Sequence, residues 1–367
     1  MPPRRAALIA FLAGWMFLPC GGYEIKYFPE YDKTTATCMG ILVATLIFDT
    51  ARITGFKPHW LDLFPLLSCI VPFFSSIRNG LGPYDGISAS VGTAMTWMSP
   101  YLIGRLYFTD FRSMRELIVG LFVAGLVYMP LCLFEMRMSP NLHFWVYGFT
   151  KSPFILSLRG GGYRPVVFMN TGLMLALFMG FTALSGFGLW LSNAKKVILG
   201  LPIGISVAAL SLTTLMCRSM GALILFVAGV LSLMAIKYAK TSLPVTMLAL
   251  ASIGYIVIRG SGLWSGLELV DVASTTLGAD RAGSLRVRIV NESALSERAR
   301  QRPVVGWGGW GGSRVVDEQG RDTSITDGFW IIVFGTLGAL GMVGFLGTIL
   351  APALFLVYRV PERYWMH

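Results

Sequence analysis

The sequence predicts an all-α polytopic membrane protein, and its composition and long apolar runs support this prediction. Of the 367 residues, 54% are hydrophobic and 13% are charged, whereas soluble domains contain about 25% charged residues. The runs 165–191 and 220–236 are each close to the ~20 residues that an α-helix needs to cross a bilayer. A chain with so few charged groups cannot cover a water-soluble fold of this size.

About ten apolar segments are expected to be transmembrane helices. They cover residues 6–20, 36–49, 61–76, 87–104, 116–134, 166–191, 197–216, 219–236, 241–258 and 328–358. Segment 6–20 follows two arginines as a signal peptide does, but it lacks a small-x-small cleavage site, so we expect it to remain as the first helix. The last segment is long, and its glycines and Pro352 permit a bend or a division into two shorter segments.

Basic residues predict the orientation of these helices. If the N-terminus is cytoplasmic, every cytoplasmic connection carries at least two Lys or Arg residues, as the positive-inside rule requires. These residues are Arg4 and Arg5; Arg52 and Lys57; Arg105, Arg112 and Arg115; Lys195 and Lys196; Lys237 and Lys240; and Arg359 and Arg363. Both termini are therefore expected in the cytoplasm, and the opposite ends of the helices form what we call the predicted outer face.

The chain divides into three parts on this topology. Residues 1–258 hold nine transmembrane helices, 259–327 form a large outer loop, and 328–367 hold the last transmembrane segment and a cytoplasmic tail. Within the outer loop, the apolar residues of 284–301 follow a helical period, which predicts an amphipathic helix that Pro303 ends. A smaller outer loop is expected at 134–165.

Several function classes are excluded by the composition and by missing motifs. The net charge of +11 follows from topology rather than from binding to nucleic acid. The five cysteines are scattered through apolar segments and have neither disulfide nor metal-site spacing. No metalloprotease, nucleophile-elbow, P-loop or Asp-x-Asp motif is present. We therefore expect neither a metal nor another cofactor.

Arginines on the predicted outer face are the main candidates for binding. Arg218 lies in a tight turn between two long apolar helices, where few groups can solvate it. The guanidinium fork suits phosphate oxygens, so we expect Arg218, with Arg159 and Arg164, to hold a pyrophosphate group. Arg286 and Arg288 are two positions apart, so at most one should reach a common ligand. The alternative is a snorkelling Arg218, or one paired with Glu135.

Acid–base candidates are few. Asp327 stands where the outer loop enters the last apolar segment, and a carboxylate desolvated at that boundary can act as a base. Asp327 or Thr326 equally suits a helix N-cap. His143 is the one histidine expected outside, and its aromatic neighbours favour a structural role.

The stretch "RPVVGWGGWGG" contains the spacing G-x-G-x-x-G at Gly306, Gly308 and Gly311. A dinucleotide loop needs a strand before it and a helix after it, whereas here an arginine-rich helix and a proline come first. Glycines and tryptophans at a membrane boundary instead predict a tight loop with close backbone approach and interfacial indoles. We expect this loop to act as a hinge, with Trp307 or Trp310 as a further candidate for contact with sugar.

An ordered set of segments resembles the O-antigen ligase and O-antigen polymerase superfamily. "LTTLMCRSMGALILF" resembles the family's T-x-SR-GA segment, and "RPVVGWG" resembles its P-x-x-G-x-G. Between them lies an outer-loop helix with Arg286 or Arg288, and "TSITDGFWIIVFGTLGALG" is similar to the segment that opens the family's next span. The order and spacing agree over about residues 205–350.

The resemblance implies a metal-independent, inverting glycosyltransferase of the C superfamily in the bacterial inner membrane. Such enzymes transfer a glycan from undecaprenyl diphosphate to a glycan or lipid acceptor at the periplasmic face, in cell-envelope polysaccharide biosynthesis. Arg218 matches a diphosphate-binding arginine by motif position, and Arg286 or Arg288 matches more loosely. The ligases have His-Asn where this chain has Thr326-Asp327, which favours a polymerase or exopolysaccharide enzyme.

Two other functions stay open at the level of sequence. A transporter or flippase for a lipid-linked glycan would use the same arginines without chemistry, although we see no internal repeats of the kind that transporters have. A non-catalytic subunit of an assembly complex is the third possible function.

Overall fold

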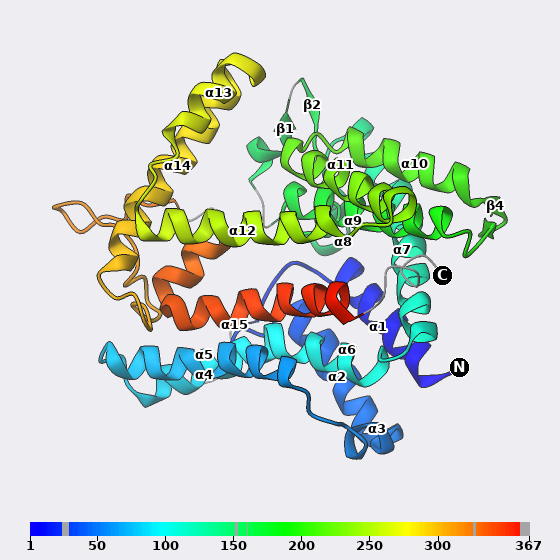
Figure 1. Cartoon of the computed structure of the whole chain (residues 1–367), viewed down its shortest axis with the longest axis horizontal. Helices are drawn as coiled ribbons and strands as arrows, with labels where there is room; N and C mark the ends of the chain where they lie inside the picture. Colours follow the sequence, from blue (N-terminus) through cyan, green and yellow to red (C-terminus); the bar gives the residue numbers. More distant parts are fainter. Residues whose placement is uncertain (24–28, 151–152, 160, 326–327, 360–367) are drawn as a thin grey trace.

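The computed structural model describes residues 1–23, 29–150, 153–159, 161–325 and 328–359, and it confirms the all-α class (Figure 1). Within these ranges the named strands form two short antiparallel hairpins. Strands β1 (Leu158–Arg159) and β2 (Gly162–Tyr163) form the first, and β3 (Val197–Ile198) and β4 (Leu201–Pro202) form the second. All other regular structure in the described ranges is helical.

Helices make up most of the described chain. In chain order they are α1 (Pro3–Phe17), α2 (Lys33–Phe48), α3 (Thr50–Thr54), η1 (Trp60–Asp62), α4 (Leu63–Arg78), α5 (Pro83–Thr93), the π-helical turn η2 (Ala94–Met98), α6 (Ser99–Tyr107), α7 (Phe111–Met138), α8 (Leu142–Tyr147), η3 (Phe154–Ser157), α9 (Gly172–Leu191), α10 (Ile203–Met216), α11 (Met220–Met234), the π-helical turn η4 (Ala235–Ala239), α12 (Leu243–Ser261), α13 (Leu267–Leu277), α14 (Ala279–Arg300) and α15 (Phe329–Arg359).

Six helical segments in the described ranges are long and apolar enough to cross a membrane. They are Trp60–Arg78, Phe111–Met138, Gly172–Leu191, Met220–Ala239, Leu243–Ser261 and Phe329–Arg359. The multi-pass membrane class is therefore confirmed. The other four segments expected to span are also helical, but α1, α2 and α10 are shorter than these six, and η2 interrupts the run from α5 to α6.

Two expected helices begin later than the apolar pattern predicts. The segment expected at 166–191 becomes helical at Gly172, because the Thr171 hydroxyl accepts the Met174 N–H at 3.2 Å and caps the helix. The segment expected at 197–216 becomes helical at Ile203, because residues 197–202 form the β3–β4 hairpin. Residues 166–171 therefore belong to the loop before α9, at the predicted outer face.

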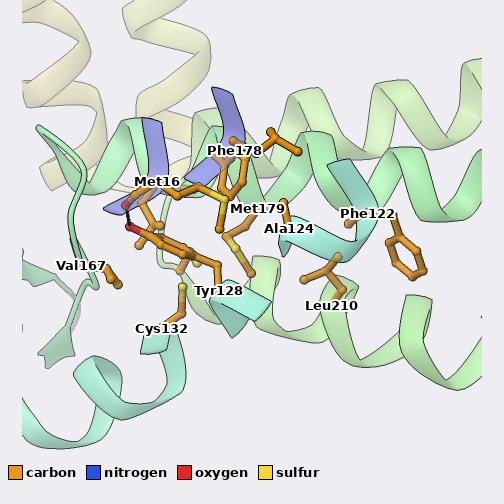
Figure 2. Packing of buried hydrophobic residues seen from close by; sticks show 14 of the residues in the cluster. Met16, Phe122, Ala124, Tyr128, Cys132, Val167, Phe178, Met179 and Leu210 are labelled. Carbon is orange, nitrogen blue, oxygen red and sulfur yellow. Dashed lines mark hydrogen bonds between the residues drawn. The ribbon is translucent and has the colours of Figure 1, made fainter. Parts of the chain in front are cut away.

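One bundle packs α7 against α1, α9 and α10, with α11 on the far side of α9. Its centre is the fully buried Phe122 and Tyr128 of α7, Leu175 and Met179 of α9, and Leu210 of α10 (Figure 2). The Tyr128 hydroxyl donates to the Met16 carbonyl and accepts the Phe168 N–H, both at 3.0 Å. These two bonds join α1 and the segment before α9 to the core.

A second bundle packs α4 against α5 and α15, and α15 against α12 and α14. Figure 1 shows α4, α12 and α15 running along one direction, with the α13–α14 pair projecting from one end. At Gly344 of α15, an added Cβ would lie 2.8 Å from the Ser68 nitrogen of α4. The absence of a side chain there lets the two helix backbones approach closely, as in other membrane bundles.

Helix α15 is broken at Gly338, whose φ of 65° and ψ of −163° are not helical. The loop 303–308 pairs its backbone with the break on both sides. The Trp307 and Gly308 N–H groups donate to the carbonyls of Gly335 and Thr336, both at 2.9 Å. In return, the Ala339 and Leu340 N–H groups donate to the carbonyls of Pro303 and Val304 at 2.7 and 3.1 Å. The backbone groups that the break leaves unpaired are thus satisfied by protein.

Side chains of α4 hold the same loop from the other side. The Ser75 hydroxyl donates to the Thr336 carbonyl at 3.0 Å, and the Asn79 amide donates to the Gly306 carbonyl at 3.0 Å. Arg302 donates to the Asn79 side-chain oxygen. The glycine-rich stretch is therefore a backbone connector between α14, α15 and α4, as the expected close approach requires, and it has no surrounding βαβ unit.

The two tryptophans of this loop differ in environment. The Trp307 ring packs against the guanidinium groups of Arg298 and Arg302, whose Cζ atoms are 3.6 and 4.2 Å from the ring centroid. Its indole N–H donates to the Arg298 carbonyl at 2.9 Å, so Trp307 is engaged within the protein. Trp310 is 81% exposed and has a positive φ of 57°.

Replacing Gly306 should destabilise the fold. Gly306 has a φ of 70°, and an added Cβ would lie 2.4 Å from the Thr336 carbonyl carbon. We expect Gly306→Ala to lower the free energy of unfolding by more than about 2 kcal/mol, from backbone strain and overpacking. The apparent melting temperature of the purified protein in detergent measures this loss. Gly309→Ala is the matched control, since nothing lies within 4 Å of its added Cβ; equal melting temperatures for the two variants would contradict the close packing of this loop.

Candidate functional site

The β1–β2 hairpin presents two of the predicted arginines at the predicted outer face. Arg159 ends β1 and is exposed, and Arg164 directly follows β2. The Arg164 N–H donates to the Ser157 carbonyl at 2.7 Å, which closes the base of the hairpin. The glycine-rich sequence of the turn suits this geometry, because Gly161 has a φ of 72°.

Arg218 lies against the same hairpin. It occupies the turn between α10 and α11 with a φ of 53°, and its Nη1 donates to the Arg159 carbonyl at 2.6 Å. Its guanidinium covers Gly162, where an added Cβ would lie 2.5 Å from Nη2. The turn before α11 and the hairpin before α9 are thereby joined through an arginine side chain.

Glu135, the partner considered for Arg218, is engaged elsewhere. Its carboxylate is completely buried and accepts the N–H groups of Leu142, Val166 and Val167 at 3.0, 2.8 and 2.7 Å. These bonds hold the end of α7 against α8 and the segment before α9. Glu135 therefore organises the loop backbone.

Arg164 is the least compensated of these arginines. Its side chain packs against Gly172, and its Nε is buried without a hydrogen-bond partner among the described residues. Burial lowers the pKa of the Arg164 guanidinium, and the positive charges of Arg159 and Arg288 lower that pKa further. Because a guanidinium stays protonated in proteins, this position is a partly buried cation that favours an anion.

Arg288 reaches this region from α14. It lines a cavity of about 210 Å³ together with Tyr255, Glu292 and the two residues Ile325 and Gly328. Those two residues flank Thr326 and Asp327, so the base predicted at Asp327 lies outside the described residues. The cavity nonetheless adjoins the place where the outer loop enters α15.

Arg159, Arg164 and Arg218 lie together at the β1–β2 hairpin, and the charge of Arg288 is near enough to lower the pKa of Arg164. We call these four residues the arginine cluster. Arg286 is exposed on α14, and two positions from Arg288 it points to a different side of the helix. A ligand common to these arginines stays a prediction.

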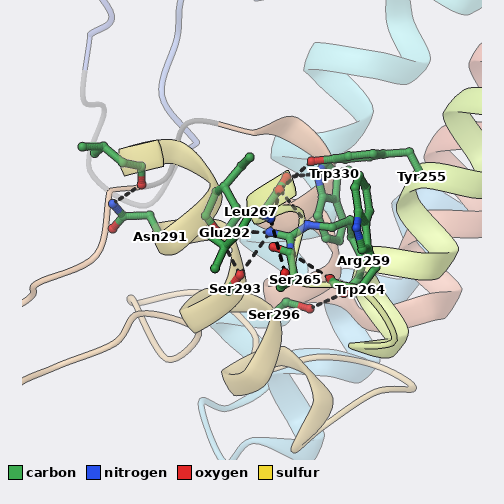
Figure 3. Close-up of polar contacts among 12 residues, drawn as sticks. Tyr255, Arg259, Trp264, Ser265, Leu267, Asn291, Glu292, Ser293, Ser296 and Trp330 are labelled. Atoms are coloured by element: carbon green, nitrogen blue, oxygen red, sulfur yellow. Dashed lines mark hydrogen bonds and ion pairs between the residues drawn. The ribbon is translucent and has the colours of Figure 1, made fainter. Parts of the chain in front are cut away.

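A buried ion pair that sequence reasoning missed holds α14 in place (Figure 3). Arg259, at the end of α12, is 3% exposed, and its Nε and Nη2 donate to Glu292 Oε2 at 3.1 and 3.0 Å. Its Nη1 donates to the carbonyls of Trp264 and Ser265 at 3.0 and 2.6 Å. Arg259 stands at the predicted outer end of a span, where the positive-inside bias opposes a basic residue. Its position against this bias is the one feature of the sequence that could have indicated a buried ion pair.

Glu292 connects the pair to two further helices. The Tyr255 hydroxyl of α12 donates to its Oε2 at 2.6 Å, and the Trp330 indole of α15 donates to its Oε1 at 2.5 Å (Figure 3). The preceding residue, Asn291, accepts the Ile325 N–H at 3.0 Å. These bonds fix α14, and with it Arg288, relative to α12 and to the start of α15.

Metal ligation has no basis in the described residues. No group of three or more His, Cys, Asp or Glu side chains among them is placed to hold a metal ion. His143 is structural, since its Nε2 accepts the Cys20 N–H at 3.1 Å and its Nδ1 lies 2.7 Å from the Phe149 carbonyl.

Comparison of the chain with protein-family models, with curated proteins and with solved structures found no match.

Removing the charge of Glu292 should destabilise the outer end of the second bundle. Glu292→Gln leaves the buried Arg259 without its carboxylate, and breaking a buried pair in this way costs about 3 kcal/mol or more. Hydrogen exchange of α14 and the apparent melting temperature would report the loss. Glu297→Gln, at an exposed position of the same helix, is the control and should change stability by less than about 0.5 kcal/mol. Similar effects of both variants would show that the pair does not anchor α14.

Proposed function

We propose that this protein transfers or polymerises a glycan carried on undecaprenyl diphosphate, using the arginine cluster to hold the diphosphate. The acceptor is a hydroxyl group of a glycan or lipid, and the reaction inverts the sugar carbon without a metal. The observation that carries the proposal is Arg164, a partly buried cation whose Nε has no partner among the described residues and whose described charged neighbours are also arginines.

The chemistry needs negative charge to be stabilised as it develops on the leaving group. The acceptor oxygen attacks the sugar carbon, the bond from that carbon to the diphosphate oxygen breaks, and the diphosphate leaves with the bonding electrons. Guanidinium groups already placed at that oxygen stabilise this charge more in the transition state than in the ground state. Asp327 is proposed to take the proton of the acceptor hydroxyl.

The fold proposed with this activity is a ten-span, C-superfamily-like arrangement in the bacterial inner membrane. Both termini would be cytoplasmic, so that the arginine cluster faces the periplasm. The support is the distribution of basic residues, together with the ordered segments at 205–350 that resemble O-antigen ligases and polymerases.

A flippase or transporter is the alternative, and the broken helix α15 is the observation in its favour. Transporters use discontinuous helices whose unwound backbone groups bind the substrate or a coupling ion. Here the groups at Gly335, Thr336, Ala339 and Leu340 are bonded to the loop 303–308. A break that protein backbone already fills supports the transferase better than the transporter.

Replacing Arg164 should remove most of the activity while the fold persists. Arg164→Gln keeps much of the packing against Gly172 but removes the charge, so we expect the release of undecaprenyl diphosphate from lipid-linked glycan to fall about 10²-fold or more. The assay uses purified protein without metal. Inorganic pyrophosphate should raise the apparent melting temperature of the wild type and not that of the variant.

Arg137→Gln is the matched control, because Arg137 is an exposed arginine at the predicted outer end of α7. It should leave both measurements unchanged. If the wild type moves lipid-linked glycan across vesicles without releasing undecaprenyl diphosphate, the protein is a transporter. If Arg164→Gln loses neither activity nor the response to pyrophosphate, the arginine cluster is not the anion site.

A smaller change should displace Arg218 without unfolding the hairpin. The methyl group of Gly162→Ala would lie 2.5 Å from Arg218 Nη2, and the end of that flexible side chain would have to move. We expect the apparent melting temperature to stay unchanged and KM for the lipid-linked donor to rise about tenfold. Gly221→Ala, in the first turn of α11 where an added Cβ meets nothing within 4 Å, is the control. A normal KM in Gly162→Ala would show that the position of Arg218 is irrelevant to donor binding.

A further inference from the structure

A second cavity, of about 320 Å³, lies beside the arginine cluster and is not explained by it. Its volume falls in the range of about 300–1,000 Å³ that is typical of small-molecule sites. Its wall includes Ser157, the residue whose carbonyl accepts the Arg164 N–H. The floor includes Val166 and Val167, which follow Arg164 closely in the chain. The cavity and the arginine cluster therefore meet at the base of one hairpin.

The described lining of this cavity combines apolar side chains with a few neutral polar ones. Among the described residues, none that lines it is Asp, Glu, Lys or Arg. The side chains of Asn141, Thr150 and Ser157 line it, and they make no side-chain hydrogen bond within the part of the chain that the structure describes. Ser157 is only 4% exposed, and a ligand in the cavity can bond to its hydroxyl. Both ring nitrogens of His143, a further lining residue, are already engaged.

Aromatic side chains complete the wall. Phe144 and Phe154 line the cavity and are each about half exposed, at 53% and 51%. An aromatic face beside neutral donors and acceptors suits a ring that has apolar C–H faces and hydroxyl edges, as a sugar has. The described lining offers a diphosphate no cation, and an alkyl chain would leave the amide and the hydroxyls unpaired at a cost.

The floor is held in a strained conformation. Val167 is fully buried and has a φ of 50°, which is rare for a β-branched residue and costs on the order of 1–3 kcal/mol. The Glu135 carboxylate enforces it by accepting the N–H groups of both Val166 and Val167. Strain that a buried carboxylate maintains at a cavity floor is typical of a site whose shape is used.

We propose that this cavity binds an uncharged sugar residue of the glycan whose diphosphate the arginine cluster holds, an inference that rests on the proposed function. The base of the hairpin then joins two parts of one site, with the anion at the arginines and the neutral sugar against Phe144, Phe154 and the Ser157 hydroxyl. The position of the sugar relative to the diphosphate is set by Ser157 and by residues 161–167. No described residue of the lining offers a cation to a uronic acid.

Saturation-transfer NMR on the full-length protein tests the proposal. The protein is kept in lauryldimethylamine oxide, a detergent without a sugar head group, and is given methyl glycosides of glucose, galactose, mannose and N-acetylglucosamine. At least one neutral glycoside should show transfer to its ring protons, and methyl glucuronide should bind more weakly. The double variant Asn141→Leu, Ser157→Ala should weaken the affinity about tenfold or more, because it removes two polar partners.

A second pair of variants keeps the test valid if that double variant does not fold. Phe154→Ala removes an aromatic wall and should reduce transfer, whereas Ile155→Ala, an exposed neighbour that does not line the cavity, should leave it unchanged. The proposal is overturned if no neutral glycoside binds, if the glucuronide binds best, or if 1-octanol displaces the glycoside as a better ligand for an apolar pocket.

The two proposals fail separately. If neutral glycosides bind and their binding depends on Asn141 and Ser157 while no undecaprenyl diphosphate is released, the sugar site is supported and the transferase activity is contradicted. If Arg164→Gln abolishes release while neither variant of the cavity changes glycoside binding or KM, the transferase activity is supported and the sugar site is contradicted.

Discussion

The backbone pairing between the loop 303–308 and the break in α15 is the constraint on which the predicted outer face depends. An unpaired backbone group away from water costs free energy, and a helix broken at membrane depth must have its groups satisfied by protein. The loop provides this on both sides of Gly338. In doing so it fixes where α14 ends, where α15 begins and how both meet α4. The position of Arg288 on α14 follows from that arrangement.

The Arg259–Glu292 pair adds orientation to this scaffold. A buried ion pair contributes little net stability when compared with well-packed apolar side chains, whereas its loss on one side leaves an uncompensated charge. Its effect is to favour one register of the helices, since Glu292 is bonded at once to Arg259 and Tyr255 of α12 and to Trp330 of α15. Helix α14 cannot slide or rotate without breaking several charged bonds together. Arg288, which lies on α14, is therefore held in a fixed position relative to α12 and α15.

Sequence patterns predicted the features of the fold that depend on local composition. They failed for features that depend on contacts between residues far apart in the chain. Apolar runs located the helical segments, and the stretch 284–301 with a helical period falls almost entirely within α14. The start of α9 was misjudged because residues 166–169 are apolar, and three of them line a cavity. The glycines of α15 indicated a bend, but the choice of Gly338 depends on a loop about 30 residues earlier. The partnership of Arg259 and Glu292, 33 positions apart, has no local sequence signal.

The arginine cluster concentrates positive charge beside the β1–β2 hairpin. Arg218 is held by the carbonyl of another arginine, and Glu135, the carboxylate at the end of α7, is bonded to three backbone N–H groups. Arg164 is placed beside two like charges with its Nε buried and unpaired among the described residues. Mutual repulsion and desolvation both work against this arrangement. Under the proposed function a bound diphosphate would remove both costs at once, and this energy would become binding energy for the diphosphate and, as charge grows on the leaving oxygen, for the transition state.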